Sequence, residues 1–244
     1  MSLFFTYSKA DGSYMPTMAG YILLVVILLA VLIIGAAVTG KGKKFTAKQI
    51  AFSGVAIALG TVTSMIKLFE FPMGGSMTLF SMLFVTLVGY WYGTRAGITA
   101  AVAYGILQLV LGPYIINPVQ PIVDYVLAFG ALGLSGIFSK SVNGLVKGYI
   151  LAVIGRYFFA FLSGLIFFSS SAADYGFTGF FGPALYSLVY NGIYIGAEAG
   201  ITLVLLAIKP VRTAMASVKR LAVEEISRGR ENGQTTVKDQ KGCF

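Results

Sequence analysis

Seven long apolar blocks dominate this chain of 244 residues. They cover residues 21–38, 50–65, 78–92, 96–111, 119–138, 145–168 and 185–208. A helix that spans a bilayer needs about 20 mostly apolar residues, so the shorter blocks must extend into polar or glycine-rich flanks. Hydrophobic residues make up 57% of the chain and charged residues only 11%, unlike a soluble domain. The pattern predicts an all-α integral membrane protein.

The basic residues predict the orientation of these helices. If the N-terminus lies outside and the helices alternate, the inner side receives nearly all of the 18 Lys and Arg residues. Only Lys9 and Lys67 then lie outside, and Arg156 lies within a helix. This positive-inside pattern predicts a multi-pass plasma-membrane protein with a cytoplasmic C-terminus. The net charge of +9 therefore indicates topology and contact with anionic lipid rather than nucleic-acid binding.

Three parts are expected along the chain. Residues 1–45 form an N-terminal anchor helix and a cytoplasmic linker, residues 46–213 a six-helix membrane domain, and residues 214–244 a basic cytoplasmic tail. The first apolar block could instead be a signal peptide. Its core is long, it lacks a basic start, and Lys41, Lys43 and Lys44 follow it, so a retained anchor helix is expected.

The composition limits the chemistry of the chain. It has no His and a single Cys, which excludes metal sites built on His or paired Cys and any His general base. The segment from Gly133 to Gly136 is similar to the serine motif of intramembrane proteases, but without a His we expect only close helix packing. No Gly-x-x-x-x-Gly-Lys-[Ser/Thr] loop is present. A membrane enzyme acting on lipid would need clustered acids or a His near the inner face. We therefore expect a protein that is not an enzyme and needs no cofactor or metal.

Three charged residues stand out because they lie away from the ends of the apolar blocks: Asp124, Arg156 and Glu198. Charges inside a bilayer are costly and usually face a cavity or a partner. Arg156 and Glu198 each lie about 15 Å from the inner end of their predicted helices, at 1.5 Å per residue. Equal depth on consecutive antiparallel helices predicts a structural ion pair. A direct role in ligand binding or proton relay is the alternative.

Polar and aromatic residues gather in the outer half of the predicted bundle. They include Tyr114, Asn117, Asp124, Tyr125, Phe168, Tyr186 and Asn191. Aromatic residues at a membrane boundary often form only an interfacial belt. A belt does not explain Asp124 and Asn191 beneath it. One carboxylate, one amide and several aromatic faces instead predict a cage for an aromatic organic cation.

Four segments give the chain a family resemblance. They are residues 71–77, 112–125, 156–168 and 186–191. With them the chain resembles the thiamine-specific substrate-binding (S) subunits of energy-coupling-factor vitamin transporters, over about residues 46–209. The resemblance implies a six-helix S-component bundle, here preceded by one extra N-terminal transmembrane helix, with a vitamin pocket near the outer face.

The resemblance also implies roles for individual residues. Asp124 stands at the family's acidic position, Tyr186 and Asn191 at its Tyr and Asn ligands, and Phe168 at its stacking aromatic residue. Further pocket positions fall on Tyr104, Tyr114, Asn117 and Tyr125. The chain differs at Ala160 and Asn117, where the family usually has His, and at Gly74 and Gly75, where some members have Trp. A related vitamin or precursor is therefore the alternative to thiamine.

The resemblance implies partners as well: a membrane coupling subunit and two ATPase subunits that drive uptake. In the family the first helix of the bundle meets the coupling subunit through small residues. Gly54 and Ala58 supply such a pair here, although packing within the protein is an equal alternative. A stand-alone carrier that uses Asp124 or Glu198 as a proton site is the other alternative function.

Overall fold

Seven helical segments occupy the apolar blocks in the computed structural model, which describes residues 4–8, 13–39 and 45–223. They are α1 (Met18–Thr39), α2 (Ala47–Met65), α3 (Ser81–Tyr92), α4 (Thr94–Leu111), residues 122–138, α6 (Gly144–Phe167) and α7 (Gly182–Ala207). Within the described residues, α4, α6 and α7 are long and apolar enough to cross a membrane, and α3 and residues 122–138 are shorter apolar helices.

The chain divides into two units, Met1–Leu203 and Val204–Phe244. The first unit contains all elements from β1 to α6 and η4, and α7 as far as Leu203. The second holds the end of α7 and a helix over residues 209–223 that carries Lys209, Arg212, Lys219 and Arg220. The tail predicted over residues 214–244 is thus helical as far as residue 223, and its remainder lies outside the described residues. The predicted domain boundary at residue 213 stays a prediction.

The segment over residues 122–138 changes its helical type along its length. It begins as a π-helix, η2 (Ile122–Leu127), passes through α5 (Ala128–Gly130) and ends as a 3-10 helix, η3 (Ala131–Phe138). Glycines let η3 approach its neighbours closely: a Cβ on Gly133 would lie 2.2 Å from the backbone nitrogen of Ile98 on α4. The hydroxyl of Ser135 donates to the carbonyl of Thr86 on α3 at 2.8 Å. The prediction that residues 133–136 serve packing is therefore confirmed.

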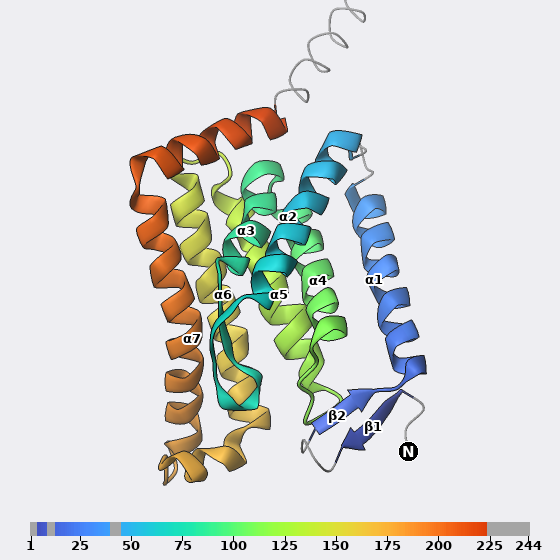
Figure 1. The fold of residues 1–244 in the computed structure, drawn as a ribbon, viewed down its shortest axis with the longest axis vertical. Helices are drawn as coiled ribbons and strands as arrows, with labels where there is room; N and C mark the ends of the chain where they lie inside the picture. Colours follow the sequence, from blue (N-terminus) through green and yellow to red (C-terminus); the bar gives the residue numbers. More distant parts are fainter. Residues whose placement is uncertain (1–3, 9–12, 40–44, 224–244) are drawn as a thin grey trace, which may run out of the picture. The chain divides into compact units, whose positions relative to one another are not determined.

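Two short hairpins interrupt the all-helical pattern, and neither was predicted. β1 (Phe5–Ser8) pairs antiparallel with β2 (Ser13–Pro16), and β3 (Lys67–Glu70) pairs antiparallel with β4 (Ser76–Thr78). A single 3-10 turn, η1 (Pro72–Gly74), joins β3 to β4. Figure 1 shows the β3–β4 hairpin extending from the end of α2 toward the end of the bundle at which α6 stops.

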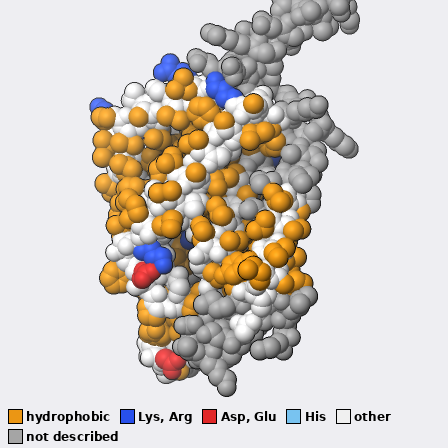
Figure 2. Space-filling view, turned by 45° about the vertical axis from the view of Figure 1, so that its right-hand side comes forward, with side chains coloured by type: hydrophobic (Ala, Val, Ile, Leu, Met, Phe, Trp, Pro, Cys, Tyr) orange, Lys and Arg blue, Asp and Glu red, His pale blue; other side chains and the backbone are white. Residues whose placement is uncertain are grey.

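The outer surfaces of the helices suit contact with lipid. On α6, Ile154, Phe158 and Ile166 are exposed, and α7 exposes Leu185, Leu188 and others in the same way. Figure 2 shows hydrophobic side chains over most of the described surface on one face, with charged groups at only a few places. In a bilayer this surface needs no further cover, because the lipid tails are equally apolar.

The carboxylate of Glu198 joins α7 to the β3–β4 hairpin and to the start of α3. Glu198 is only 3% exposed. One carboxylate oxygen accepts from the backbone nitrogen and the hydroxyl of Thr78, at 3.1 and 2.7 Å. The other accepts from the Ser81 hydroxyl at 3.2 Å and the Met82 backbone nitrogen at 3.0 Å. Four donors thus compensate a buried charge that would otherwise be costly.

This network corrects the predicted ion pair between Arg156 and Glu198. Among the residues that the structure describes, no salt bridge joins the two side chains. The guanidinium of Arg156 instead lies over the ring of Phe129, 4.3 Å from its centroid. The prediction used only the depth of the two residues, and depth does not determine the direction in which each side chain leaves its helix. The Glu198 carboxylate accepts its hydrogen bonds from hydroxyl and backbone N–H groups instead.

We expect Glu198→Gln to lower the thermal stability of the ligand-free protein. An amide nitrogen cannot accept hydrogen bonds, so two of the four donors would lose their partner at a cost of about 1–3 kcal/mol each. Because Arg156 is not in contact with Glu198, the losses in Glu198→Gln and Arg156→Met should add in the double variant. Thermal unfolding in detergent measures both effects.

Glu70→Gln is the matched control for this series, since Glu70 is exposed and paired with Lys67 at the surface. Its melting temperature should stay close to that of the parent. If the double variant at Arg156 and Glu198 instead regained most of the lost stability, this result would support a direct ion pair between the two side chains and contradict the expectation of additive losses.

Candidate functional site

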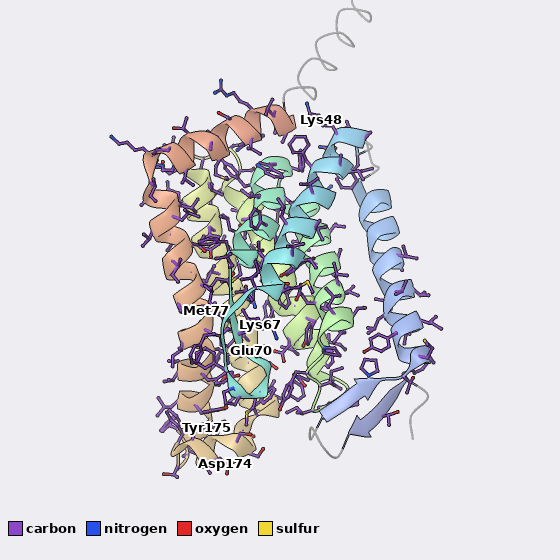
Figure 3. All side chains as sticks on the ribbon, in the orientation of Figure 1. Lys48, Lys67, Glu70, Met77, Asp174 and Tyr175 are labelled. Atoms are coloured by element: carbon purple, nitrogen blue, oxygen red, sulfur yellow. The ribbon has the colours of Figure 1, made fainter. Side chains whose placement is uncertain are left out.

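A cavity of about 410 Å³ opens in the first unit. Its walls come from the β3–β4 hairpin, the ends of α2 and α4, the loop over residues 112–121, η2 and α5, the second half of α6 and the first half of α7. Each of these parts lies toward the same end of the bundle. Figure 3 shows Asp174 and Tyr175 at that end and Lys48, near the start of α2, at the opposite end.

A column of tyrosines on α7 forms one wall. Tyr186, Tyr190 and Tyr194 follow one another at four-residue intervals, which places them on one face of the helix. Their ring centroids are 5.6 and 5.7 Å apart in turn. Tyr175, on the short helix η4 (Ser169–Tyr175), stacks on Tyr186 at 5.4 Å. The wall therefore presents continuous aromatic surface to the cavity.

The β3–β4 hairpin is fastened to this wall by tyrosine hydroxyls. Tyr190 donates to the carbonyl of Pro72 and accepts from the backbone nitrogen of Gly75 at 3.0 Å. The Tyr186 hydroxyl lies 3.2 Å from the sulfur of Met73. A Cβ on Gly75 would lie 2.6 Å from the Tyr190 hydroxyl, so the close approach of the hairpin requires glycine at this position.

Gln120 positions the acidic residue of the site. Its side chain is 2% exposed, and its amide nitrogen donates to Asp124 at 2.8 Å and to the carbonyl of Tyr114 at 3.1 Å. Its amide oxygen accepts from the backbone nitrogen of Ile116 at 2.9 Å. One buried amide therefore fixes both the 112–121 loop and the carboxylate that lines the cavity.

Aromatic rings flank this carboxylate. Tyr114 stacks on Phe168, with centroids 6.2 Å apart and an angle of 16° between the rings. The backbone nitrogen of Tyr114 donates to the hydroxyl of Tyr125 at 3.1 Å. Deeper in the cavity, Tyr104 packs edge-on against Phe129 at 5.3 Å. This combination of one acid and several ring faces can bind a planar cation by charge and by cation–π attraction.

Asn191 lines the cavity but is engaged largely with the protein. Its side-chain nitrogen donates to the carbonyls of Ser187 at 2.9 Å and Ala160 at 3.2 Å. Its oxygen accepts from the Tyr194 hydroxyl at 2.8 Å. Asn191 thus holds α7 against α6 and orients Tyr194, so part of its contribution to the site is positional.

Seven of the eight residues predicted to bind substrate line this cavity. They are Tyr104, Tyr114, Asp124, Tyr125, Phe168, Tyr186 and Asn191. Asn117 is not among the lining residues: it is exposed, and its side-chain oxygen accepts from the backbone nitrogen of Val119 at 2.9 Å, so its role in binding stays a prediction. An Asn before Pro118 favours such a local turn.

Other lining residues lie outside the predicted set, among them Gln120, Tyr194 and Arg156. The four-residue spacing from Tyr186 through Tyr190 could have indicated Tyr194. The four-residue spacing between Gln120 and Asp124 is a similar signal, since both fall on one face of a helix. Arg156 was assigned to an ion pair instead. Within the described residues, no three His, Cys, Asp or Glu side chains come together as a metal site would require.

Comparisons with known proteins agree with this fold. A family described as thiamine transporter protein (Thia_YuaJ) matches residues 50–217. The thiamine transporter ThiT of Bacillus subtilis is 30% identical over 158 residues, which cover 59% of this chain and 78% of the relative. ThiT of Lacticaseibacillus paracasei is 32% identical over 110 residues, 38% of this chain and 52% of the relative.

A solved structure extends the comparison to three dimensions. ThiT from Listeria monocytogenes superposes with a TM-score of 0.50 at 26% identity, covering 67% of this chain and 93% of that chain. The predicted architecture, an S-component bundle preceded by an extra N-terminal helix, is therefore confirmed, and so is a transport protein rather than an enzyme. The chain belongs to the thiamine transporter protein (Thia_YuaJ) family.

Proposed function

We propose that this protein binds thiamine in the cavity and delivers it across the membrane as the substrate-binding subunit of an ATP-driven importer. The observation that carries the proposal is the placement of Asp124 among stacked rings. Thiamine is a cation built of two planar rings. The carboxylate supplies its counter-charge, and the faces of Phe168, Tyr114 and the α7 tyrosines supply stacking surface.

We infer the direction of transport from the charge at the end of the bundle away from the cavity. Lys48 lies at the start of α2, at the end of the bundle away from the cavity. By the positive-inside rule this end faces the cytoplasm, so the cavity faces outward and collects ligand from outside the cell. The multi-pass chain then has its N-terminus outside and its C-terminus in the cytoplasm.

Energy would come from other subunits, because the sequence has no nucleotide-binding loop. We place the docking surface for a membrane coupling subunit on α2. Gly54 and Ala58 lie on its exposed face, and a Cβ on Gly54 would meet nothing within 4 Å. Ala56 and Gly60 lie on the opposite face, and a Cβ on Gly60 would lie 3.3 Å from Val85. One small-residue pair thus packs within the bundle and the other is left for a partner.

Asp124→Asn should weaken thiamine binding more than Asp124→Glu, because only the Asn variant removes the counter-charge. A charge-assisted contact contributes about 1.5–3 kcal/mol, or roughly a ten- to hundredfold change in affinity. Isothermal titration calorimetry of the purified protein measures this change.

Asp174→Asn is the control, since Asp174 is exposed on η4 outside the cavity. Its affinity should equal that of the parent. Equal thiamine affinities for the parent and Asp124→Asn would show that Asp124 does not contact the ligand. Tight binding of another vitamin, without binding of thiamine, would show that the substrate is that vitamin.

Gly54→Leu and Ala58→Leu should leave thiamine binding in detergent intact yet abolish uptake with the coupling subunit and the ATPases. A larger side chain would keep a partner helix at a distance, and neither residue lines the cavity. Gly196→Leu on α7 is the matched control, because a Cβ there also meets nothing within 4 Å.

Two outcomes of this uptake assay would contradict the coupling proposal. Full uptake by the α2 variants would place the docking surface elsewhere. Uptake that needs no ATPase subunits and collapses with the proton gradient would identify a stand-alone carrier.

A further inference from the structure

We infer that Leu24 of α1 is a positioning residue for the cavity, because it supports the 112–121 loop that carries Tyr114 and Gln120. The inference rests on the proposed function, since thiamine affinity is one of its two readouts. The family match begins at residue 50, so α1 lies outside the matched residues. The inference gives this additional helix a part in ligand binding.

Leu24 is buried although its neighbours on α1 are not. Among the α1 side chains that the structure describes, Leu24 is the one large apolar group that is buried, with 8% exposure, whereas Ile22 and Leu29 are exposed. Leu24 forms one buried cluster with Leu109 of α4 and Ile115 of the 112–121 loop. Figure 1 shows α1 running alongside α4. The loop residue Ile115 is thus fully enclosed between the two helices, with 0% exposure.

The β1–β2 hairpin fixes the part of α1 that carries Leu24. The backbone nitrogen of Thr17 donates to the carbonyl of Phe4 at 2.9 Å, and the Thr17 hydroxyl accepts from the backbone nitrogen of Gly20 at 3.2 Å. A Cβ on Gly20 would lie 2.2 Å from the Phe4 carbonyl oxygen, so this approach requires glycine. Leu24 follows Gly20 by four residues and therefore lies on the same face of α1, one turn further along.

Ile115 connects this cluster to the acidic residue of the cavity. It stands between Tyr114 and Ile116, and the Gln120 side chain binds the backbone of both. The same amide nitrogen of Gln120 that donates to the Tyr114 carbonyl also donates to Asp124. A displacement of Ile115 would therefore move the two backbone groups that hold Gln120 in place, and with them the partner of the Asp124 carboxylate.

Tyr125 connects the same cluster to the aromatic surface of the cavity. Its ring packs against the cluster, and its hydroxyl accepts from the backbone nitrogen of Tyr114. Tyr114 in turn stacks on Phe168. Leu24 and Ile115 are not among the residues that line the cavity, whereas Tyr114 and Tyr125 are. Leu24 thus acts through the loop and its tyrosines rather than by touching the ligand.

The test combines calorimetry with hydrogen exchange on the full-length protein. Leu24→Ala leaves a void beside the loop and lets it move. We expect the variant to bind thiamine about two- to thirtyfold more weakly than the parent, the usual range for residues that act without touching the ligand. In the ligand-free protein, amides of the 112–121 loop should exchange faster than in the parent, while those of α3 and α7 should keep their rates.

Leu29→Ala is the matched control, because it makes the same truncation at an exposed position of α1. Its thiamine affinity and loop exchange should equal those of the parent. Leu24→Met keeps about the same volume and should restore most of the affinity lost in Leu24→Ala. If Leu24→Ala fails to fold, Ile115→Val truncates the same cluster from the loop side and should change affinity and loop exchange in the same direction.

The inference requires both changes in Leu24→Ala. Parental thiamine affinity, or parental exchange of the 112–121 loop, would overturn it. Faster exchange throughout the bundle, without preference for the loop, would also overturn it, because Leu24 would then serve stability alone. Failure of the parent to bind thiamine would contradict the proposed function instead. The ligand-free exchange of the loop would still decide whether Leu24 positions it.

Discussion

The buried carboxylate of Glu198 is the interaction on which the cavity wall depends. It lies on the tyrosine face of α7, four residues after Tyr194, and it fixes Thr78 at the end of β4 and the first turn of α3. The hairpin is thereby attached to α7 at its base, while Tyr190 attaches it at its turn through Pro72 and Gly75. Two anchors on one helix thus hold a short hairpin that could not be stable by itself.

The two charged side chains of the cavity are each held by a neighbour. The Gln120 amide donates to Asp124, and the guanidinium of Arg156 lies over the ring of Phe129. In the proposed complex, Asp124 supplies the counter-charge for a cationic ring and the aromatic residues supply stacking surface.

The sequence predicted the helices well because each requires only a run of apolar residues. Each of the seven apolar blocks is occupied by a helical segment in the described chain, and the resemblance placed Asp124 and Tyr186 at the cavity. The sequence could not predict features that depend on the side of a helix from which a side chain leaves, or on local turns. Arg156 and Glu198 share a depth but meet different partners, and Asn117 turns back on Val119 because Pro118 follows it. The β3–β4 hairpin was missed because its strands are only four and three residues long and form through contacts with α7.

The central claim is that this cavity selects thiamine, and native mass spectrometry of the purified full-length protein tests it most directly. The protein would be released from detergent after incubation with an equimolar mixture of thiamine and other water-soluble vitamins. The account predicts a single adduct with the mass of thiamine at a stoichiometry of one per chain, and loss of that adduct in Asp124→Asn. An adduct of another vitamin, or a thiamine adduct that persists unchanged in Asp124→Asn, would contradict it.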